Sequence, residues 1–200
     1  MKRPDLRGVT LIELVVVVAL LAMMLMAAVP SVATWIRNTQ IRNVATGIQN
    51  GLQRARAEAM RRNVNVRFSL VSLTDPAVMD DSCTLSESGV SWVVSLDDPS
   101  SKCSGAVSDS TAPRILDKQA AGSGGNRVTA DAADAAGQDA SDVVFNGFGR
   151  AATTTGIATI TIDNNPAGDD YRALRIVVGT GGTIRMCEPK VTSSSDPRAC

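Results

Sequence analysis

The sequence predicts an α+β protein in which one long N-terminal α-helix, membrane-spanning in its first half, packs on an antiparallel β-sheet. Residues 9–29 form a 21-residue apolar stretch that contains a single charge, Glu13. Apolar residues with helical spacing continue to about residue 62. Residues 63–200 then alternate apolar and polar side chains in short segments and contain no second helical stripe. These three observations together favour a helix covering one face of a sheet.

Composition excludes several classes of function. The 200 residues accommodate one domain with an appendage, and the chain contains no histidine. Catalysis by Ser-His or Cys-His pairs is therefore excluded, as are most zinc sites. Aromatic residues make up 3% of the chain, too few for a surface on which single-stranded nucleic acid would stack. No catalytic constellation is recognisable, so we expect a non-enzymatic protein with no cofactor and no metal.

The apolar stretch 9–29 has the length of a membrane span. At 1.5 Å per residue it measures about 30 Å, the thickness of the hydrocarbon core. Residues 1–8, MKRPDLRG, precede it with three basic residues and one acidic residue, which orients the N-terminus toward the cytoplasm. An ordinary single-span anchor would have the same hydropathy. Glu13 distinguishes this segment from such an anchor, because a carboxylate in an apolar helix costs up to ~3 kcal/mol at mid-membrane and marks a candidate functional site. The alternative is that Glu13, which lies near the interface, snorkels to the headgroups.

The segment Gly8-Val9-Thr10-Leu11-Ile12-Glu13-Leu14, with the apolar run and Pro30 behind it, resembles the N-terminus of type IV pilins and pseudopilins. The resemblance implies that a prepilin peptidase cuts between Gly8 and Val9, leaving residues 1–8 as a leader. Val9 would then be N-methylated, although this family usually has Phe there. It further implies that Glu13 pairs with the N-terminal amine of a neighbouring subunit during filament assembly. Such a pair is less costly in lipid than either charge alone, and it fixes the register between subunits.

Residues 30–62 are expected to continue the helix as an amphipathic segment. Pro30 should kink the helix rather than end it, because helical periodicity resumes beyond it. Between residues 37 and 67 seven arginines face one acid, Glu58. Such a cluster indicates either nucleic-acid binding or a solvated helix face that complements acidic partners; without interleaved aromatics we favour the second. The apolar stripe consists of Ile41, Val44, Ile48, Leu52, Ala55 and Ala59.

The remainder, 63–200, is expected to be a periplasmic β-rich domain. The segment 119–142 is mostly Ala, Gly, Ser and Asp and indicates a mobile loop. The segments 174–178 and 184–186, joined by Gly179-Thr180-Gly181-Gly182, predict a β-hairpin. Other strands are expected at 63–70, 90–96, 143–145 and 158–162.

Four cysteines, at positions 83, 103, 187 and 200, allow three disulfide pairings. Nearest-neighbour pairing, Cys83 with Cys103 and Cys187 with Cys200, closes short loops, each worth about 3 kcal/mol in the chain-entropy model. Free thiols are the alternative. Disulfides require an oxidising compartment, which agrees with export of this domain beyond the inner membrane.

Further segments narrow the resemblance to the FimT/FimU/GspH branch of the pilin family. This branch comprises minor pilins and the type II secretion pseudopilin H. The resemblance implies a structural subunit that helps to initiate or cap a type IV pilus or a type II secretion pseudopilus; the sequence does not separate the two. The segments are Ala55 to Asn63, Phe145 to Arg150, Arg185 to Pro189 and Asp196 to Cys200.

The resemblance also implies a location and a set of partners. The chain would cross the bacterial inner membrane once, with its N-terminus cytoplasmic and its C-terminal domain periplasmic, before moving to the filament tip. Its partners would be other pilins or pseudopilins, the prepilin peptidase and the inner-membrane assembly platform.

The alternative is a DNA-binding minor pilin that takes up DNA in natural transformation. Some FimT members bind DNA through Gly-Arg-x-Arg, and the matching stretch here is Gly182-Thr183-Ile184-Arg185, in which Thr183 replaces the first arginine. Candidate DNA contacts are Arg185, Lys190 and Arg198. Residues 68–200 carry ten basic and 17 acidic side chains, and this excess of negative charge repels a phosphate backbone.

Overall fold

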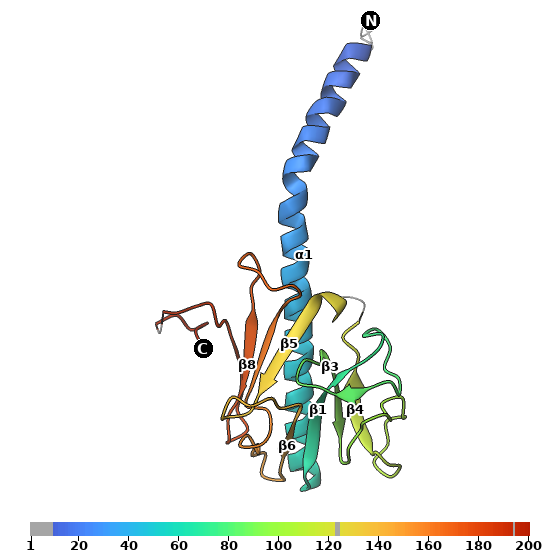
Figure 1. The fold of residues 1–200 in the computed structure, drawn as a ribbon, viewed down its shortest axis with the longest axis vertical. Coiled ribbons are helices and arrows are strands. Elements are labelled where there is room, and N and C mark those ends of the chain that lie inside the picture. The colour runs from blue at the N-terminus through green and yellow to red at the C-terminus, as the bar shows by residue number, and fades with distance from the viewer. Residues whose placement is uncertain (1–9, 123–124, 194) are drawn as a thin grey trace, which may run out of the picture. The chain divides into compact units, whose positions relative to one another are not determined.

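The structure is a computed structural model that describes residues 10–122, 125–193 and 195–200, with the backbone alone for residues 27–30. The chain divides into two compact units, Met1–Ile36 and Arg37–Cys200. Helix α1, Leu11–Arg62, has 52 residues and belongs to both (Figure 1). Position 30 lies inside this helix, so Pro30 does not end it, as expected.

Both ends of α1 have recognisable caps. At the start, the Thr10 hydroxyl accepts a hydrogen bond from the Glu13 backbone N–H at 3.3 Å, as an N-cap residue does. At the end, Asn63 has a φ of 53°, and the Val64 N–H donates to the Ala59 carbonyl at 3.3 Å. A left-handed residue followed by this bond is a Schellman motif, which explains why the helix ends at Arg62.

The second unit contains two antiparallel sheets beside the C-terminal part of α1 (Figure 1). In the first sheet β1 is central: it pairs with β3 along one edge and with β6 and β2 along the other, and β4 adds to β3. Its strands are β1 (Val66–Ser72), β2 (Thr84–Leu85), β3 (Ser91–Ser95), β4 (Ile115–Gln119) and β6 (Asp142–Phe145).

The second sheet has the order β5-β7-β8-β9. Strands β8 and β9 form the expected hairpin, with Val178 opposite Ile184. In β7 and β8 every second residue is buried, which is the pattern of a sheet with one face on the core. The strands are β5 (Val128–Ala133), β7 (Thr159–Asn164), β8 (Leu174–Val178) and β9 (Ile184–Cys187), and a short 3₁₀ turn, η1 (Gly125–Arg127), precedes β5.

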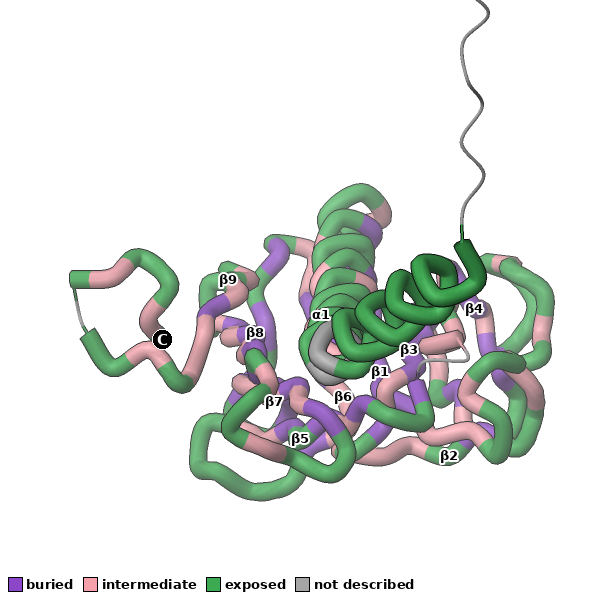
Figure 2. Tube along the Cα trace, turned by 90° about the horizontal axis from the view of Figure 1, so that it is seen from above, coloured by how far each residue is buried: buried purple, intermediate pink, exposed green. Residues whose placement is uncertain are grey.

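The core of the second unit forms between α1 and the two sheets. Five of the six stripe residues of α1 are fully buried, and Val44 is 8% exposed, so the predicted stripe is confirmed. They meet large side chains of the sheets, among them Phe68, Phe145, Ile160 and Ile176. Figure 2 shows the buried residues of α1 and of the strands around it in purple.

The predicted fold class, a long N-terminal helix packed on antiparallel β-structure, is confirmed, but the structure has two sheets where one was expected. All five residues of β3 are buried, so the first sheet is covered on both faces and not only on the face toward the helix. Val71, Val93 and Ile115 form a second apolar cluster with the Cys83 and Cys103 side chains. Loops between the strands thus cover the face that the helix does not reach.

The prediction of a mobile loop over 119–142 was also wrong. This segment contains η1 and strand β5, which pairs residue for residue with β7. Val128, Ala130 and Ala132 are buried on alternate positions. Alanine is depleted in strands and gives a weak sequence signal, but its short side chain fits close to the core here.

Candidate functional site

The candidate assembly site lies at the start of α1. Gly8 and Val9, where cleavage and methylation are expected, lie outside the described residues. Thr10 and Glu13 occupy the N-cap and N3 positions, and the Leu14 N–H donates to the Thr10 carbonyl at 3.1 Å. The sequence Thr-x-x-Glu at these positions is that of a capping box. Glu13 is exposed on the first turn, two residues from the start of the helix at Leu11.

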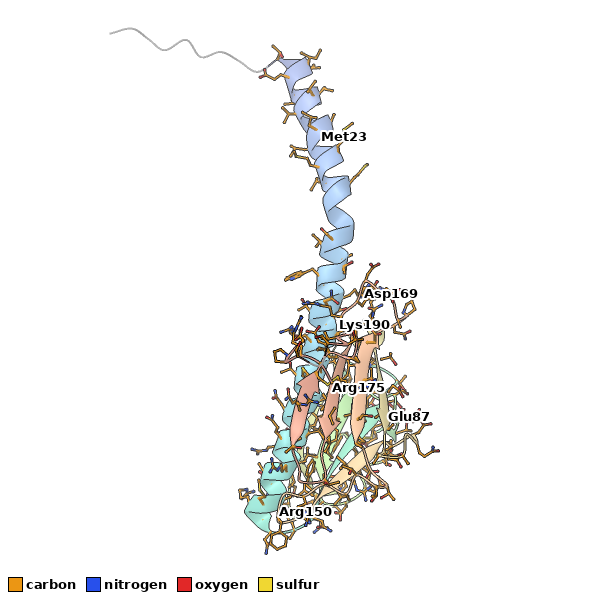
Figure 3. The ribbon with its side chains drawn as sticks, turned by 90° about the vertical axis from the view of Figure 1, so that its left-hand side faces the viewer. Met23, Glu87, Arg150, Asp169, Arg175 and Lys190 are labelled. Atoms are coloured by element: carbon orange, nitrogen blue, oxygen red, sulfur yellow. A yellow bond between two sulfur atoms is a disulfide. The ribbon has the colours of Figure 1, made fainter. Side chains whose placement is uncertain are left out.

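The N-terminal part of α1 is apolar on every side. Among the described residues this helix is the one long and apolar enough to cross a membrane, with a mean hydropathy of 2.8 in the best window, none of which is buried. The leucine, valine and methionine side chains described between residues 11 and 26 are at least half exposed, as Met23 illustrates in Figure 3. A helix that is apolar all round needs an apolar environment, either lipid or other helices.

A buried carboxylate organises the other end of α1. Glu58 is 5% exposed and accepts hydrogen bonds from Arg61 and Arg62, with its Oε2 at 2.6 Å from Nη2 of Arg61 and 2.8 Å from Nε of Arg62. Nη2 of Arg54 lies 3.3 Å from the other carboxylate oxygen. Arg62 also pairs with Asp109 in the loop before β4, with its Nη1 at 3.1 Å from the Asp109 Oδ2. This network links the last turns of the helix to the first sheet.

The arginines also determine the protonation of Glu58. Burial by itself would raise the pKa of this carboxyl. The hydrogen bonds from Arg61 and Arg62, with the charges of Arg61 and Arg54, outweigh it and hold the pKa below its usual value. Glu58 is therefore ionised at neutral pH.

Most of the seven arginines between residues 37 and 67 have partners inside the second unit. Arg67 pairs with Asp142 at 2.7 Å, and Arg37 donates to the Gln40 side chain at 3.1 Å. Arg42 lines a groove that also contains Glu188 and Arg198. With the Glu58 network, this favours the interpretation of the cluster as a helix face that complements acidic groups rather than a nucleic-acid surface.

Arg56 belongs to a junction that the sequence analysis missed. Its Nε donates to the carbonyl of Gly149 at 3.2 Å. A Cβ on Gly182 would lie 1.8 Å from the same carbonyl oxygen, and Gly182 has a φ of 77°. The turn after β6, the β8–β9 turn and the helix thus meet at one point. The turn at residues 179–182 was predicted from the sequence, but nothing there indicated that it contacts the turn that contains Gly149.

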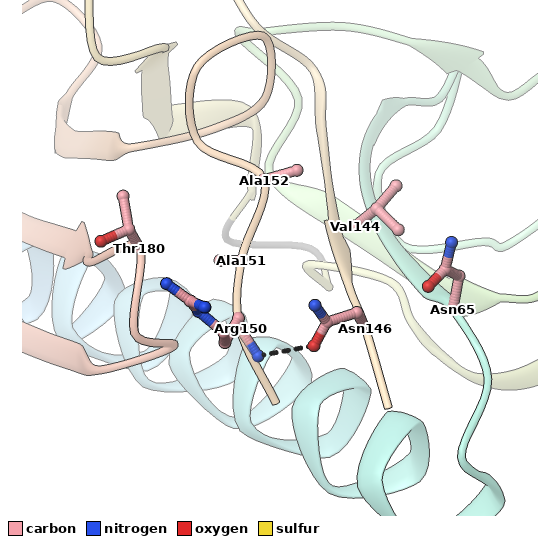
Figure 4. Close-up of a pocket in the computed structure, with 7 residues that line it drawn as sticks. All are labelled: Asn65, Val144, Asn146, Arg150, Ala151, Ala152 and Thr180. Atoms are coloured by element: carbon pink, nitrogen blue, oxygen red, sulfur yellow. Dashed lines mark hydrogen bonds between the residues drawn. The ribbon is translucent and has the colours of Figure 1, made fainter. Parts of the chain in front are cut away.

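A shallow groove of about 320 Å³ lies beside this junction (Figure 4). The Asn146 side chain accepts a hydrogen bond from the Arg150 backbone N–H at 3.1 Å, and the Ala151 N–H donates to the Thr180 carbonyl at 3.1 Å. These bonds hold the turn in place. The residues that line the groove offer no pairing of a nucleophile with a base; they are Asn65, Val144, Asn146, Arg150, Ala151, Ala152 and Thr180.

The three candidate DNA contacts all bind parts of the chain itself. Arg185 donates to the carbonyls of Ala199 and Cys200, at 3.3 and 3.0 Å. The Lys190 ammonium donates to the carbonyls of Gly168 and Tyr171, beside the loop that carries Asp169 (Figure 3).

Arg198 is the third of these cations. Its Nη2 lies 2.7 Å from Asp196 and its Nη1 3.8 Å from Glu188. Hydrogen bonds from the Arg198 side chain and backbone lower the pKa of Asp196 to about 2. The Gly182–Arg185 segment enters β9 from the hairpin turn. Arg185 and Arg198 thus bind the segment around residues 196–200, whereas Lys190 binds a different loop, and none of the three is left as an unpartnered cation.

Two disulfides join the four cysteines in the pairs Cys83–Cys103 and Cys187–Cys200, with Cα atoms 6.2 and 5.1 Å apart. The first lies in the apolar cluster on the outer face of the first sheet. The second ties the C-terminus to the last strand, where the Glu188 N–H also donates to the Arg198 carbonyl at 2.7 Å. Each bond therefore fixes a segment that has little regular secondary structure.

A long helix, apolar and exposed at its N-terminal part and buried against antiparallel sheets further on, defines the pilin-like class of proteins. The chain belongs to the family of the type II transport protein GspH, because the sequence model of that family matches residues 44–195. Two crystal forms of the type IV minor pilin FimU from Pseudomonas aeruginosa (strain PAO1) are similar to the chain. One match has 15% identity and a TM-score of 0.46, covering 76% of this chain and 99% of FimU. The other match has 16% identity and a TM-score of 0.48, covering 78% of this chain and 96% of FimU. No curated protein matched.

Proposed function

We propose that this chain is a minor pilin or pseudopilin, a structural subunit that helps to initiate or cap a type IV pilus or a type II secretion pseudopilus. Membership of the GspH family carries the proposal. The exposed apolar helix supports it, because such a surface needs lipid before assembly and neighbouring helices afterwards. The role requires no catalysis, and the grooves described above offer no catalytic arrangement.

The proposed life of the subunit begins in the bacterial inner membrane. The chain crosses it once, with its N-terminus in the cytoplasm and its C-terminal unit in the periplasm, where the two disulfides are stable. The prepilin peptidase removes residues 1–8, and Val9 becomes the methylated N-terminus. The assembly platform then moves the subunit out of the membrane to join other pilins or pseudopilins at the filament tip.

Glu13 is the proposed assembly residue. It lies four residues from the new N-terminus at Val9, on the first turn of α1, and is exposed. A carboxylate in an apolar surrounding is stabilised by an opposite charge, and the amine of a neighbouring subunit would supply it. Glu13 has no role in the fold of the unit Arg37–Cys200, from which it is separated by more than twenty residues of helix.

The alternative of DNA uptake is not favoured. Arg185, Lys190 and Arg198 are all engaged with carbonyls or carboxylates of the chain itself. The excess of acidic over basic side chains in residues 68–200 opposes binding of a polyanion at long range.

Filament incorporation of Glu13→Ala tests the proposal, with Val17→Ala as a matched control. Val17 lies one turn further along the same helix face and carries no charge. Both variants should reach the membrane with a folded C-terminal unit. We expect Glu13→Ala to be depleted from sheared filaments or pseudopili and Val17→Ala to be incorporated normally. Equal incorporation of the two variants would refute the role of Glu13, and absence of the wild-type chain from every filament fraction would refute the proposed function.

A further inference from the structure

The apolar surface of α1 continues past the predicted span. Residues 14–36, 23 in a row, carry no charged side chain, and Arg37 is the first charge after Glu13. Val32, Trp35 and Ile36 have the spacing of one helix face, and they are 51%, 68% and 44% exposed. Exposed apolar side chains are thus still present six residues beyond Val29.

Helix length discriminates between two boundaries of the span. A helix needs about 20 apolar residues to cross a hydrocarbon core of about 30 Å. If Glu13 stays at the cytoplasmic boundary, a span ending at Val29 leaves 16 apolar residues, or roughly 24 Å at 1.5 Å each, which is too short. A span from Glu13 to Trp35 measures about 33 Å and crosses the core with some tilt.

The residues at the C-terminal boundary of this longer span, Trp35 and Arg37, are of types that favour the lipid headgroup region. Tryptophan is enriched there because its ring is apolar while its indole N–H needs a hydrogen-bond acceptor. Arg37, two residues on, carries a charge that phosphate groups attract. Glu13 and Trp35 would thus mark the two faces of the membrane.

We propose that the membrane-spanning segment runs from Glu13 to Trp35 and that the Trp35 indole binds at the lipid headgroup level on the side of the C-terminal unit. This inference rests on the proposed function, which places the chain in a membrane before assembly. It moves the boundary from Val29 to Trp35. It also places the Glu13 carboxylate at the membrane face, where a charged group costs least.

Tryptophan fluorescence of the full chain, reconstituted in phosphatidylcholine–phosphatidylglycerol vesicles, tests this boundary. The chain has two tryptophans, and Trp92 is buried at 5% exposure in the second unit. The difference between the wild type and Trp35→Phe therefore isolates Trp35. Lipids brominated near the glycerol end of the acyl chains should quench this component about twofold more than lipids brominated near the chain ends. Its emission should also be blue-shifted relative to tryptophan in water.

A second variant makes the result depend on depth. Val32→Trp in the Trp35→Phe background moves the indole one turn toward the N-terminus, about 4.5 Å deeper. Quenching by the deep bromines should then rise and quenching by the shallow bromines should fall. Equal quenching profiles for positions 32 and 35 would overturn the proposed boundary.

The outcomes also separate this inference from the proposed function. A chain that floats with the vesicles while Trp35 emits as in water and is not quenched would overturn the boundary at Trp35 and leave the function standing. If Trp35→Phe then also failed to enter filaments, Trp35 would be a contact between subunits instead. A chain that does not associate with vesicles would overturn both.

Discussion

Replacing Glu58 by glutamine should destabilise the C-terminal unit, because it removes the charge on which three arginines converge. The strongest loss is the bond to Arg62, whose side chain is 24% exposed; a hydrogen bond between charged groups contributes about 1.5–3 kcal/mol. Arg54 and Arg61 are more than half exposed, so each of their pairs adds at most ~1 kcal/mol. Glutamine keeps the volume and one acceptor. We therefore expect a loss of about 2–3 kcal/mol in the free energy of unfolding.

The destabilisation caused by Glu58→Gln should depend on pH in a defined direction. The folded-state pKa of Glu58 lies below its usual value of 4.5, so its stabilisation is present above the unfolded-state pKa and is lost as the pH falls through the folded-state pKa. The gap between wild type and Glu58→Gln should be full at neutral pH. It should shrink as the pH falls through the lowered folded-state pKa, because Glu58 then becomes protonated and resembles glutamine.

Urea unfolding of the fragment Arg37–Cys200 measures both quantities. Glu87→Gln, in the turn between β2 and β3 (Figure 3), makes the same chemical change outside the arginine cluster and should alter stability by less than ~0.5 kcal/mol. A gap for Glu58→Gln no larger than that of the control would refute the reasoning. A gap that does not shrink on acidification would show that the carboxylate charge is not its source.

Three further predictions concern the same unit. Gly182→Ala should cost about 3 kcal/mol or more in urea unfolding, because it sets a Cβ against the Gly149 carbonyl at a positive φ and displaces the Arg56 hydrogen bond, whereas Gly181→Ala, with open space around it, should be nearly neutral. Peptide mapping without reductant should recover Cys83 linked to Cys103 and Cys187 linked to Cys200; four alkylatable thiols would contradict this. By fluorescence anisotropy the unit should bind duplex DNA with ~10⁻⁴ M affinity or weaker at physiological salt, and micromolar binding that Arg185→Ala abolishes would reverse this.

Local periodicity predicted the elements that have strong side-chain signals. The stripe of α1 and the strands β1, β3, β7, β8 and β9 follow from spacings of three to four and of two residues, because burial on one face imposes those periods. Strands β4 and β5 were missed for a physical reason. β4 has two apolar residues at one end, and three of the six residues of β5 are alanine, so their strand conformation depends on pairing with β3 and β7.

Contacts between distant segments could not be predicted. The Arg56–Gly149 bond joins residues 93 apart, and Arg67 and Asp142 are separated by 75 residues. Counting charges along the helix made Glu58 a lone acid among arginines. In the fold, Asp109 pairs with Arg62 at the end of the helix, and Asp142 pairs with Arg67 on strand β1. Glu58 itself is buried. The N-terminal motif needed no tertiary information, because its residues are contiguous in the sequence, from Gly8 to Leu14.

The intact mass of the chain extracted from membranes tests the central claim most directly. If the protein is a processed pilin-like subunit, the mass must correspond to a chain that begins at Val9 and has both disulfides formed. An added methyl group would identify the modified N-terminus. A chain that still begins at Met1, or one cut near Pro30 as by a signal peptidase, would contradict the assignment.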